Sequence, residues 1–241
     1  MRLQVALSHA GLASRRKSAD LVRLGKVKVN GKVVLEPGFR CDPSKDIITC
    51  GRKKCIPEKP VYIMLNKPRG VLSTSRDSRG RKTVLDLISD GGNRLYHVGR
   101  LDKDSSGLLL LTNDGEVAYR LMHPKFEIKR VYQVAIRGSL KEEDRSRMAK
   151  GIILEGERTS PCEIKIIKGS MNKTIISVKL HEGKKRQIRN MFQKFGYNVL
   201  KLKRLRFGPL ELKGLDAGEH RGLTVHETKN LKKALGLGAC I

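Results

Sequence analysis

The segment from His97 to Gly115 reads HVGRLDKDSSGLLLLTNDG and carries the clearest structural pattern of the chain. Its second half contains four consecutive leucines between glycine and polar residues, which predicts a short buried strand. Its first half is polar, so Asp102 is expected in a loop directly before that strand. Gly99 and Gly107 bracket this loop and would let a ligand approach the backbone closely.

Asp102 has two interpretations that the spacing alone does not separate. Arg100 and Lys103 surround it with positive charge, so its carboxylate should stay ionised and could act as a nucleophile or general base. An aspartate in a turn also commonly accepts Asx-type hydrogen bonds, which requires no chemistry. Both readings stay open at this point.

The loop has a superficial similarity to a calcium-binding loop, with Asp102, Asp104 and Ser106 at alternate positions. The twelfth position is Asn113 instead of the bidentate Glu, so calcium is not expected. The clustered cysteines Cys41, Cys50 and Cys55 lack the CxxC spacing of zinc sites, and the chain contains neither GxGxxG nor GxxxxGK[ST]. We therefore expect no metal and no cofactor.

The charge of the chain is strongly unbalanced. Its 241 residues include 51 Lys and Arg against 24 Asp and Glu, which gives a formal net charge of +27. Such self-repulsion is offset by a polyanion, most commonly a nucleic acid, whereas an anionic membrane is the competing partner. No apolar run is long enough to span a bilayer. The odd number of cysteines (five) and the lack of a secretory signal predict reduced thiols in the cytoplasm.

The first part of the chain predicts a small helix–helix–hairpin unit. The hairpin is indicated by Asn30-Gly31 between two alternating β-branched runs. Cations fill the first turn of the second helix, where the helix dipole disfavours them. We expect this surface to contact RNA or DNA, with an ordinary solvated basic face as the alternative. The cations concerned are Arg15, Arg16, Lys17 and, on the hairpin, Lys28.

A Pro-containing linker near residues 57–60 separates this unit from the rest, which predicts domains at 1–58 and 59–241. In the second domain, strand-like runs do not alternate regularly with helical ones. This order favours an α+β fold with a mixed, largely antiparallel sheet and flanking helices. The expected strands are 61–65, 131–136, 164–167, 174–180 and 199–205, and the expected helices are 115–122, 141–150 and 186–194.

Several ordered motifs resemble the RsuA/RluB family of ribosomal pseudouridine synthases. The loop and strand at 99–115 are similar to the catalytic motif of that family, and the N-terminal unit resembles the S4 RNA-binding domain. Further matching segments are Asn66–Val71, Arg130-Val131-Tyr132, Glu182–Phe192 and Arg204–Leu210. Small departures are Phe207 where Ile is usual, and Lys184 and Lys185 where Arg and Asn are common.

The resemblance implies roles for individual residues. Asp102 would be the essential carboxylate, Tyr132 would lie against the extruded base, and Arg189 would pair with Asp102. Tyr132 on its pattern alone is a half-buried strand residue, and Arg189 a cation on a helix face. Further residues expected to contact RNA are Arg100, which would help to extrude the uridine, and the backbone contacts Lys67, Lys184, Lys185 and Arg186.

The resemblance implies an enzyme that isomerises uridine to pseudouridine in ribosomal RNA. The segments 67–71 and 79–84 are more similar to the large-subunit, B-type members. We expect a monomer that acts on 23S ribosomal RNA, free or in an assembling large subunit, without a small-molecule cofactor or membrane. The alternative is a non-catalytic RNA-binding protein that assists ribosome assembly, since the charge and the S4-like unit support both.

Overall fold

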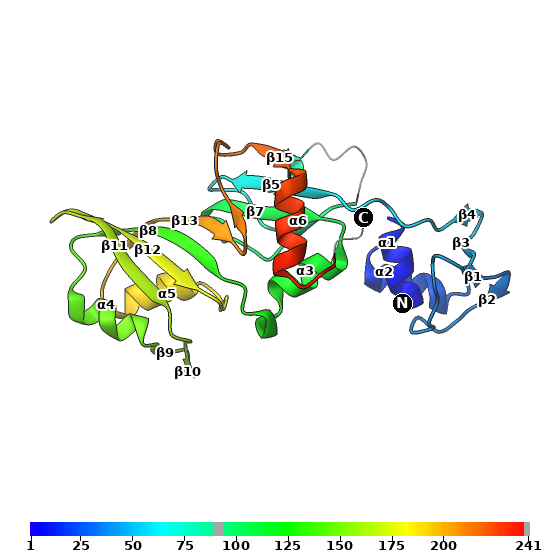
Figure 1. Cartoon of the computed structure of the whole chain (residues 1–241), viewed down its shortest axis with the longest axis horizontal. Coiled ribbons are helices and arrows are strands. Elements are labelled where there is room, and N and C mark those ends of the chain that lie inside the picture. The colour runs from blue at the N-terminus through cyan, green and yellow to red at the C-terminus, as the bar shows by residue number, and fades with distance from the viewer. Residues whose placement is uncertain (89–93, 239–241) are drawn as a thin grey trace. The chain divides into compact units, whose positions relative to one another are not determined.

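The computed structural model describes residues 1–88 and 94–238, and the chain forms two compact units (Figure 1). The first contains residues 1–61, and the second contains most residues from Tyr62 onward. The sequence predicts a domain boundary between residues 58 and 59. A division into compact units does not show where independently folding domains end, so this boundary stays a prediction. No helix in the described ranges combines the length and apolar character needed to cross a membrane.

The N-terminal unit has the expected helix–helix–hairpin order. Ser14 caps the second helix by accepting a hydrogen bond of 3.3 Å from the backbone of Lys17. Asn30 and Gly31 both have positive φ, as a two-residue hairpin turn requires. Two strands that were not expected extend the hairpin into a sheet of order β2-β1-β3-β4. The elements are α1 (Leu3–His9), α2 (Arg15–Arg23), β1 (Val27–Val29), β2 (Lys32–Val33), β3 (Ile48–Cys50) and β4 (Lys53–Lys54).

The second unit is built on a sheet that has nine strands within the described residues, in the order β11-β12-β8-β13-β7-β5-β15, with β14 beside β13 and β6 beside β7. The pairs are antiparallel except for β13 and β7, which run parallel. This is the mixed, largely antiparallel sheet that the sequence predicts. The strands are β5 (Tyr62–Lys67), β6 (Tyr96–Val98), β7 (Ser106–Thr112), β8 (Arg130–Arg137), β11 (Glu163–Gly169), β12 (Lys173–Leu180), β13 (Val199–Phe207), β14 (Leu210–Glu211) and β15 (His220–Gly222).

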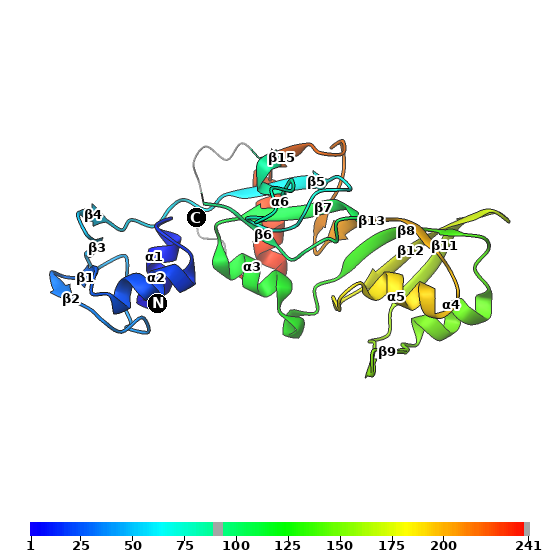
Figure 2. The ribbon, with the colours of Figure 1, turned by 180° about the vertical axis from the view of Figure 1, so that it is seen from behind.

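Two separate hydrophobic cores lie under this one sheet. One joins β5, β6 and β7 to two helices, through buried residues such as Leu108, Leu110 and Leu231. The other joins β8, β11 and β12 to the remaining two, through residues such as Ile176 and Phe192. Figures 1 and 2 show α6 on one side of β5 and β7. The helices are α3 (Gly115–Met122) and α6 (Val225–Ala234) in the first core, and α4 (Glu142–Ala149) and α5 (Gln187–Lys194) in the second.

The helices expected at 115–122, 141–150 and 186–194 are α3, α4 and α5. Helix α6 was not expected, although its capping box, formed by Thr224 and Glu227, is a recognisable start signal. Short 3-10 turns are η1 (Leu85–Leu87) and η2 (Pro124–Phe126), and a small hairpin is formed by β9 (Ile153–Leu154) and β10 (Glu157–Arg158).

Strand β11 is one edge of the large sheet. Its register against β12 shifts between Ile166 and Lys168, which marks a bulge. From Lys165 to Gly169 all residues are exposed, including Ile166 and Ile167. Lys165 forms an ion pair with Glu163 of the same strand.

The parallel contact between β7 and β13 is unusually close. Gly107 lies opposite Arg204 with φ of +108°, and a Cβ there would meet the Arg204 backbone oxygen at 2.3 Å and its nitrogen at 2.5 Å. Arg204 is 2% exposed, and its Nε donates to the Leu108 oxygen at 2.7 Å. Its guanidinium also stacks on Phe207, 4.8 Å from the ring centre, so the side chain fixes this junction from inside the sheet.

We expect Gly107→Ala to destabilise the protein strongly. A positive φ costs a non-glycine residue about 1–3 kcal/mol, and the clash with Arg204 adds about 1–3 kcal/mol of overpacking. Gly80→Ala is the matched control, because Gly80 also has positive φ but no atom within 4 Å of the added Cβ. Thermal unfolding of both variants measures the difference, and equal losses would show that the close approach carries no energy.

Candidate active site

Asp102 lies in the loop between Gly99 and β7, and backbone contacts hold this loop in shape. The amide of Ser105 donates to the Asp102 carbonyl at 3.0 Å, closing a turn. The Ser73 hydroxyl donates to the Leu101 carbonyl at 2.8 Å and accepts from the Leu101 amide at 3.1 Å. Asp102 is therefore held between two fixed neighbours while its side chain stays 37% exposed.

Lys67, at the end of β5, supports the same loop from inside. Its side chain is fully buried, and Nζ donates to the carbonyls of Pro68 at 2.9 Å, Asp102 at 3.2 Å and Ser105 at 2.9 Å. Burial lowers its pKa to about 8, while the charges of Asp102 and Asp104 oppose that shift. The expectation that Lys67 contacts the RNA backbone is wrong, because its ammonium group is enclosed and already has three acceptors.

Two arginines at the start of α5 face two carboxylates of the loop. Arg186 Nη1 lies 3.9 Å from Asp102 Oδ2 and 3.4 Å from Asp104 Oδ1. Arg189 Nη2 lies 3.2 Å from Asp104 Oδ2. The expected pair between Arg189 and Asp102 is thus replaced by a pair with Asp104, two residues further along the loop.

The position of Arg189 explains this difference. Its side chain is only 11% exposed, and it also donates to the Val199 carbonyl at 3.2 Å and the Asp104 carbonyl at 3.1 Å. Burial lowers the pKa of Arg189, against the opposing charge of Asp104 and, more weakly, of Asp102. Partial burial alone would raise the pKa of Asp104. The positive charge of Arg189 is the main opposing effect, and the pKa of Asp104 is lowered on balance.

The carboxylate of Asp102 has fewer and longer contacts than that of Asp104. Within residues 1–88 and 94–238 it accepts no hydrogen bond, and its one ion contact is the 3.9 Å approach of Arg186. It opens into a cleft of about 530 Å³. The lining is rich in cations and includes Arg76, Arg81, Arg100, Lys103 and Arg186. A cleft with one free carboxylate among guanidinium groups suits an anionic substrate.

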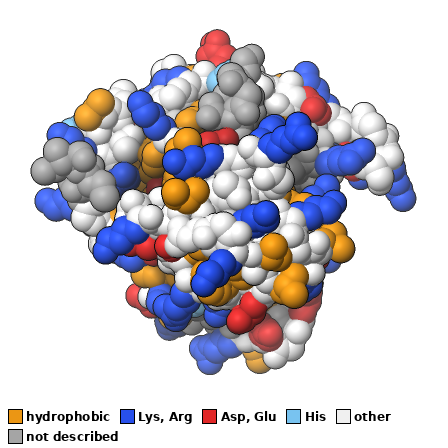
Figure 3. Space-filling view, turned by 90° about the vertical axis from the view of Figure 1, so that its right-hand side faces the viewer, with side chains coloured by type: hydrophobic (Ala, Val, Ile, Leu, Met, Phe, Trp, Pro, Cys, Tyr) orange, Lys and Arg blue, Asp and Glu red, His pale blue; other side chains and the backbone are white. Residues whose placement is uncertain are grey.

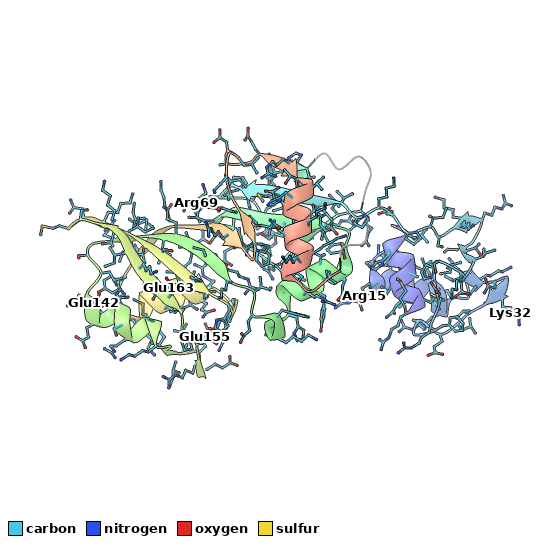
Figure 4. The ribbon with its side chains drawn as sticks, in the orientation of Figure 1. Arg15, Lys32, Arg69, Glu142, Glu155 and Glu163 are labelled. Atoms are coloured by element: carbon cyan, nitrogen blue, oxygen red, sulfur yellow. The ribbon has the colours of Figure 1, made fainter. Side chains whose placement is uncertain are left out.

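Arg69 follows β5 by two residues and is labelled in Figure 4. It is exposed, and its positive charge acts on Arg189. The next residue, Gly70, donates its amide to the Lys103 carbonyl at 2.7 Å, which ties this segment to the Asp102 loop. Ser73, Asp104 and Arg69 were not expected as site residues, although Arg69 and Asp104 stand inside the matched motifs.

Tyr132 is the third residue of β8, opposite Arg204 of β13. It is half-buried and packs against the core that includes Ile188 and Phe192. This placement matches the structural interpretation of a strand tyrosine, and the described contacts do not link its hydroxyl to Asp102.

The remaining residues predicted to contact RNA differ in whether the protein itself already pairs with them. Lys184 Nζ is engaged with Glu157 at 2.8 Å and with the Arg158 carbonyl at 3.0 Å, whereas Lys185 is exposed. In the N-terminal unit the predicted cations are exposed, and α2 has no acidic residue in its first turn. Figure 3 shows Lys and Arg side chains spread over the face that it draws. The exposed cations are Arg15, Arg16, Lys17 and Lys28.

No group of three or more His, Cys, Asp or Glu side chains in the described part of the chain could hold a metal ion. The charged side chains that line the cleft are those of aspartate, arginine and lysine residues.

Comparisons with known proteins agree on one family. Residues 61–194 match the model of RNA pseudouridylate synthases, and residues 1–47 match the S4 domain. The chain is 47% identical to ribosomal large subunit pseudouridine synthase B of Bacillus subtilis, over 96% of this chain and 95% of that protein. It is 40% identical to an uncharacterised RNA pseudouridine synthase of Aquifex aeolicus, over 98% and 96%. A crystal structure of a pseudouridylate synthase matches with a TM-score of 0.69 at 29% identity, covering 96% of this chain and 99% of that one.

We expect Lys67→Met to change how stability depends on pH. The native pKa of about 8 is below the unfolded value of 10.5, so between these values the unfolded chain binds the extra proton. The stability contribution of Lys67 therefore rises with pH in this window, by up to about 1.4 kcal/mol per pH unit. Thermal melts from pH 7 to 10 should show wild type gaining on Lys67→Met as pH increases. A constant difference between the two would contradict the buried ammonium.

Proposed function

Because the chain belongs to the RNA pseudouridylate synthase family and carries an S4 domain, we propose that it converts specific uridines of large-subunit ribosomal RNA into pseudouridine. The family makes it a pseudouridine synthase. The choice of RNA is supported by the relative from Bacillus subtilis, whose name specifies the large ribosomal subunit. We propose that the protein acts as a monomer in the cytoplasm, on free ribosomal RNA or on an assembling particle.

The observation that carries this proposal is the free carboxylate of Asp102 in a cationic cleft. Pseudouridine formation breaks the bond between C1′ of the ribose and N1 of uracil, turns the base, and joins C1′ to C5. The uracil stays in the site throughout, and no electron or phosphoryl group is transferred to another molecule. A carboxylate without a tight partner is available to act on the nucleoside, whereas the more heavily paired Asp104 is not.

The cations around the cleft have the complementary role. A uridine must leave its stack to reach Asp102, which costs a few kcal/mol. Contacts between RNA phosphates and exposed cations offset that cost. We assign Arg100 to the extruded nucleotide because it is exposed and lines the cleft. The roles of Arg186 and Lys185 are backbone contacts, since both are exposed at the start of α5.

In this proposal Arg189 and Tyr132 serve the reaction without contacting the carboxylate of Asp102 in the free protein. Arg189 supplies a positive charge near Asp102 without pairing with it directly. Tyr132 reaches the base from β8 once the uridine has entered the cleft. In the N-terminal unit, Arg15, Arg16, Lys17 and Lys28 dock a neighbouring RNA segment, as their exposure allows.

Asp102→Asn should abolish pseudouridine formation and keep RNA binding within about two-fold, because the substitution removes the reactive carboxylate but preserves its size. The assay is chemical mapping of pseudouridine in large-subunit ribosomal RNA transcripts treated with each protein. Glu142→Gln is the matched control, since Glu142 pairs with Arg145 on α4, outside the cleft. Modification by Asp102→Asn at the wild-type rate would exclude this role, and the alternative of a non-catalytic assembly protein would then stand.

RNA binding should weaken steeply between about 50 and about 200 mM salt. Each phosphate neutralised by Lys or Arg releases counterions, so the logarithm of affinity falls linearly with the logarithm of salt concentration. Filter binding or fluorescence anisotropy with the same transcript measures the slope. An affinity that is independent of salt would remove the electrostatic part of the proposal.

A further inference from the structure

Asp104 has more contacts with the arginines of α5 than Asp102 has. Its carboxylate is 3.2 Å from Arg189 and 3.4 Å from Arg186, and its own carbonyl accepts from Arg189 at 3.1 Å. Two of the three polar groups that contact the Arg189 guanidinium therefore belong to one residue, and the third is the Val199 carbonyl. No proton transfer or bond formation in the proposed reaction requires Asp104.

The burial of Arg189 makes these contacts important. Its side chain is 11% exposed, and its Nε is buried without a hydrogen-bond partner among the described residues. A guanidinium in such a place cannot exchange a lost protein partner for water, so removing one carboxylate leaves the buried charge poorly compensated. Asp104 is the only carboxylate within ion-pair distance of Arg189 in the described ranges.

Arg186 is held differently. It has left-handed backbone torsions, with φ of 49°, and it precedes the first residue of α5. Its side chain is 43% exposed and stands between the two carboxylates, 0.5 Å nearer to Asp104 (3.4 against 3.9 Å). Asp104 therefore draws this guanidinium away from Asp102 as well.

On this basis we propose that Asp104 is a positioning residue, which fixes Arg186 in the lining of the cleft and the buried Arg189 beside the Asp102 loop, and leaves the carboxylate of Asp102 without a close partner. The proposal rests on the function assigned above and names a residue that serves that reaction only through its neighbours. The lowered pKa of Asp104 agrees with it, since the carboxylate remains charged at neutral pH. Without this charge, Asp102 is the nearest carboxylate left to Arg186, and the guanidinium groups lose their arrangement around the reactive group.

The test is a double-mutant cycle on Asp104 and Arg189. We expect Asp104→Asn to lower kcat at least ten-fold on a large-subunit ribosomal RNA transcript, with RNA affinity within about two-fold of wild type. In an Arg189→Lys background, the same substitution should lower kcat by a clearly smaller factor than in the wild-type background, because one of the two guanidinium groups that Asp104 positions is already absent and only Arg186 remains. Asp104→Glu, which keeps the charge, should recover part of the lost kcat. Glu142→Gln again serves as the control for removing a carboxylate from an arginine pair.

Two results would overturn the proposal: wild-type kcat in Asp104→Asn, or losses from Asp104 and Arg189 that multiply independently. If Asp104→Asn fails to fold, Asp104→Glu takes its place in the comparison. Its kcat must lie below that of the wild type, and its fractional loss must be smaller when Arg189 is already replaced by Lys.

A second readout needs no substrate. The Nε–H resonance of Arg189 in a ¹⁵N spectrum, assigned by its loss in Arg189→Lys, should shift in Asp104→Asn or Asp104→Glu and stay in place in Glu142→Gln. If the wild-type enzyme forms no pseudouridine, the proposed function fails, whereas this resonance still decides whether Asp104 positions Arg189. An unmoved resonance in the Asp104 variants would overturn the positioning role.

Discussion

The close parallel contact between β7 and β13 is the constraint on which the catalytic unit depends. Each half of the sheet has its own hydrophobic core, and these strands join the two halves. The contact requires a residue without a side chain at position 107, and the buried Arg204 holds it through a hydrogen bond to the Leu108 carbonyl. The loop that contains Asp102 enters β7 at this junction, so the glycine that lets the strands meet is the second residue of the strand that follows this loop.

The cleft combines a rigid support with a small set of exposed charges. Lys67 and Ser73 hold the backbone of the loop from inside, through carbonyl groups and one amide. The carboxylates of Asp102 and Asp104, which both line the cleft, then differ in how closely arginines pair with them. Asp102 and Asp104 are carboxylates of the same loop, but two arginines pair closely with Asp104 and only one approaches Asp102.

Most of the fold could be predicted from the sequence, because its signals are local. Hydrophobic runs, the Asn30-Gly31 turn and the Ser14 cap each determine structure within a few residues. The site was harder to predict, because charge pairing depends on distances between distant segments. The sequence contains Asp102, Asp104 and Arg189, but only the path of α5 decides which carboxylate Arg189 meets. Lys67 likewise looks like a surface cation in the sequence, and its burial follows from the strand pairing of β5 with β7.

The exposed edge strand β11 affects the tendency of the protein to self-associate. A free edge strand with bare isoleucines offers backbone groups to any other strand, which is a common route to aggregation. In β11 the bulge after Ile166 interrupts the regular spacing of those groups, and lysines on the same strand repel another copy. The bulge and the lysines thereby disfavour the addition of a further strand at this edge.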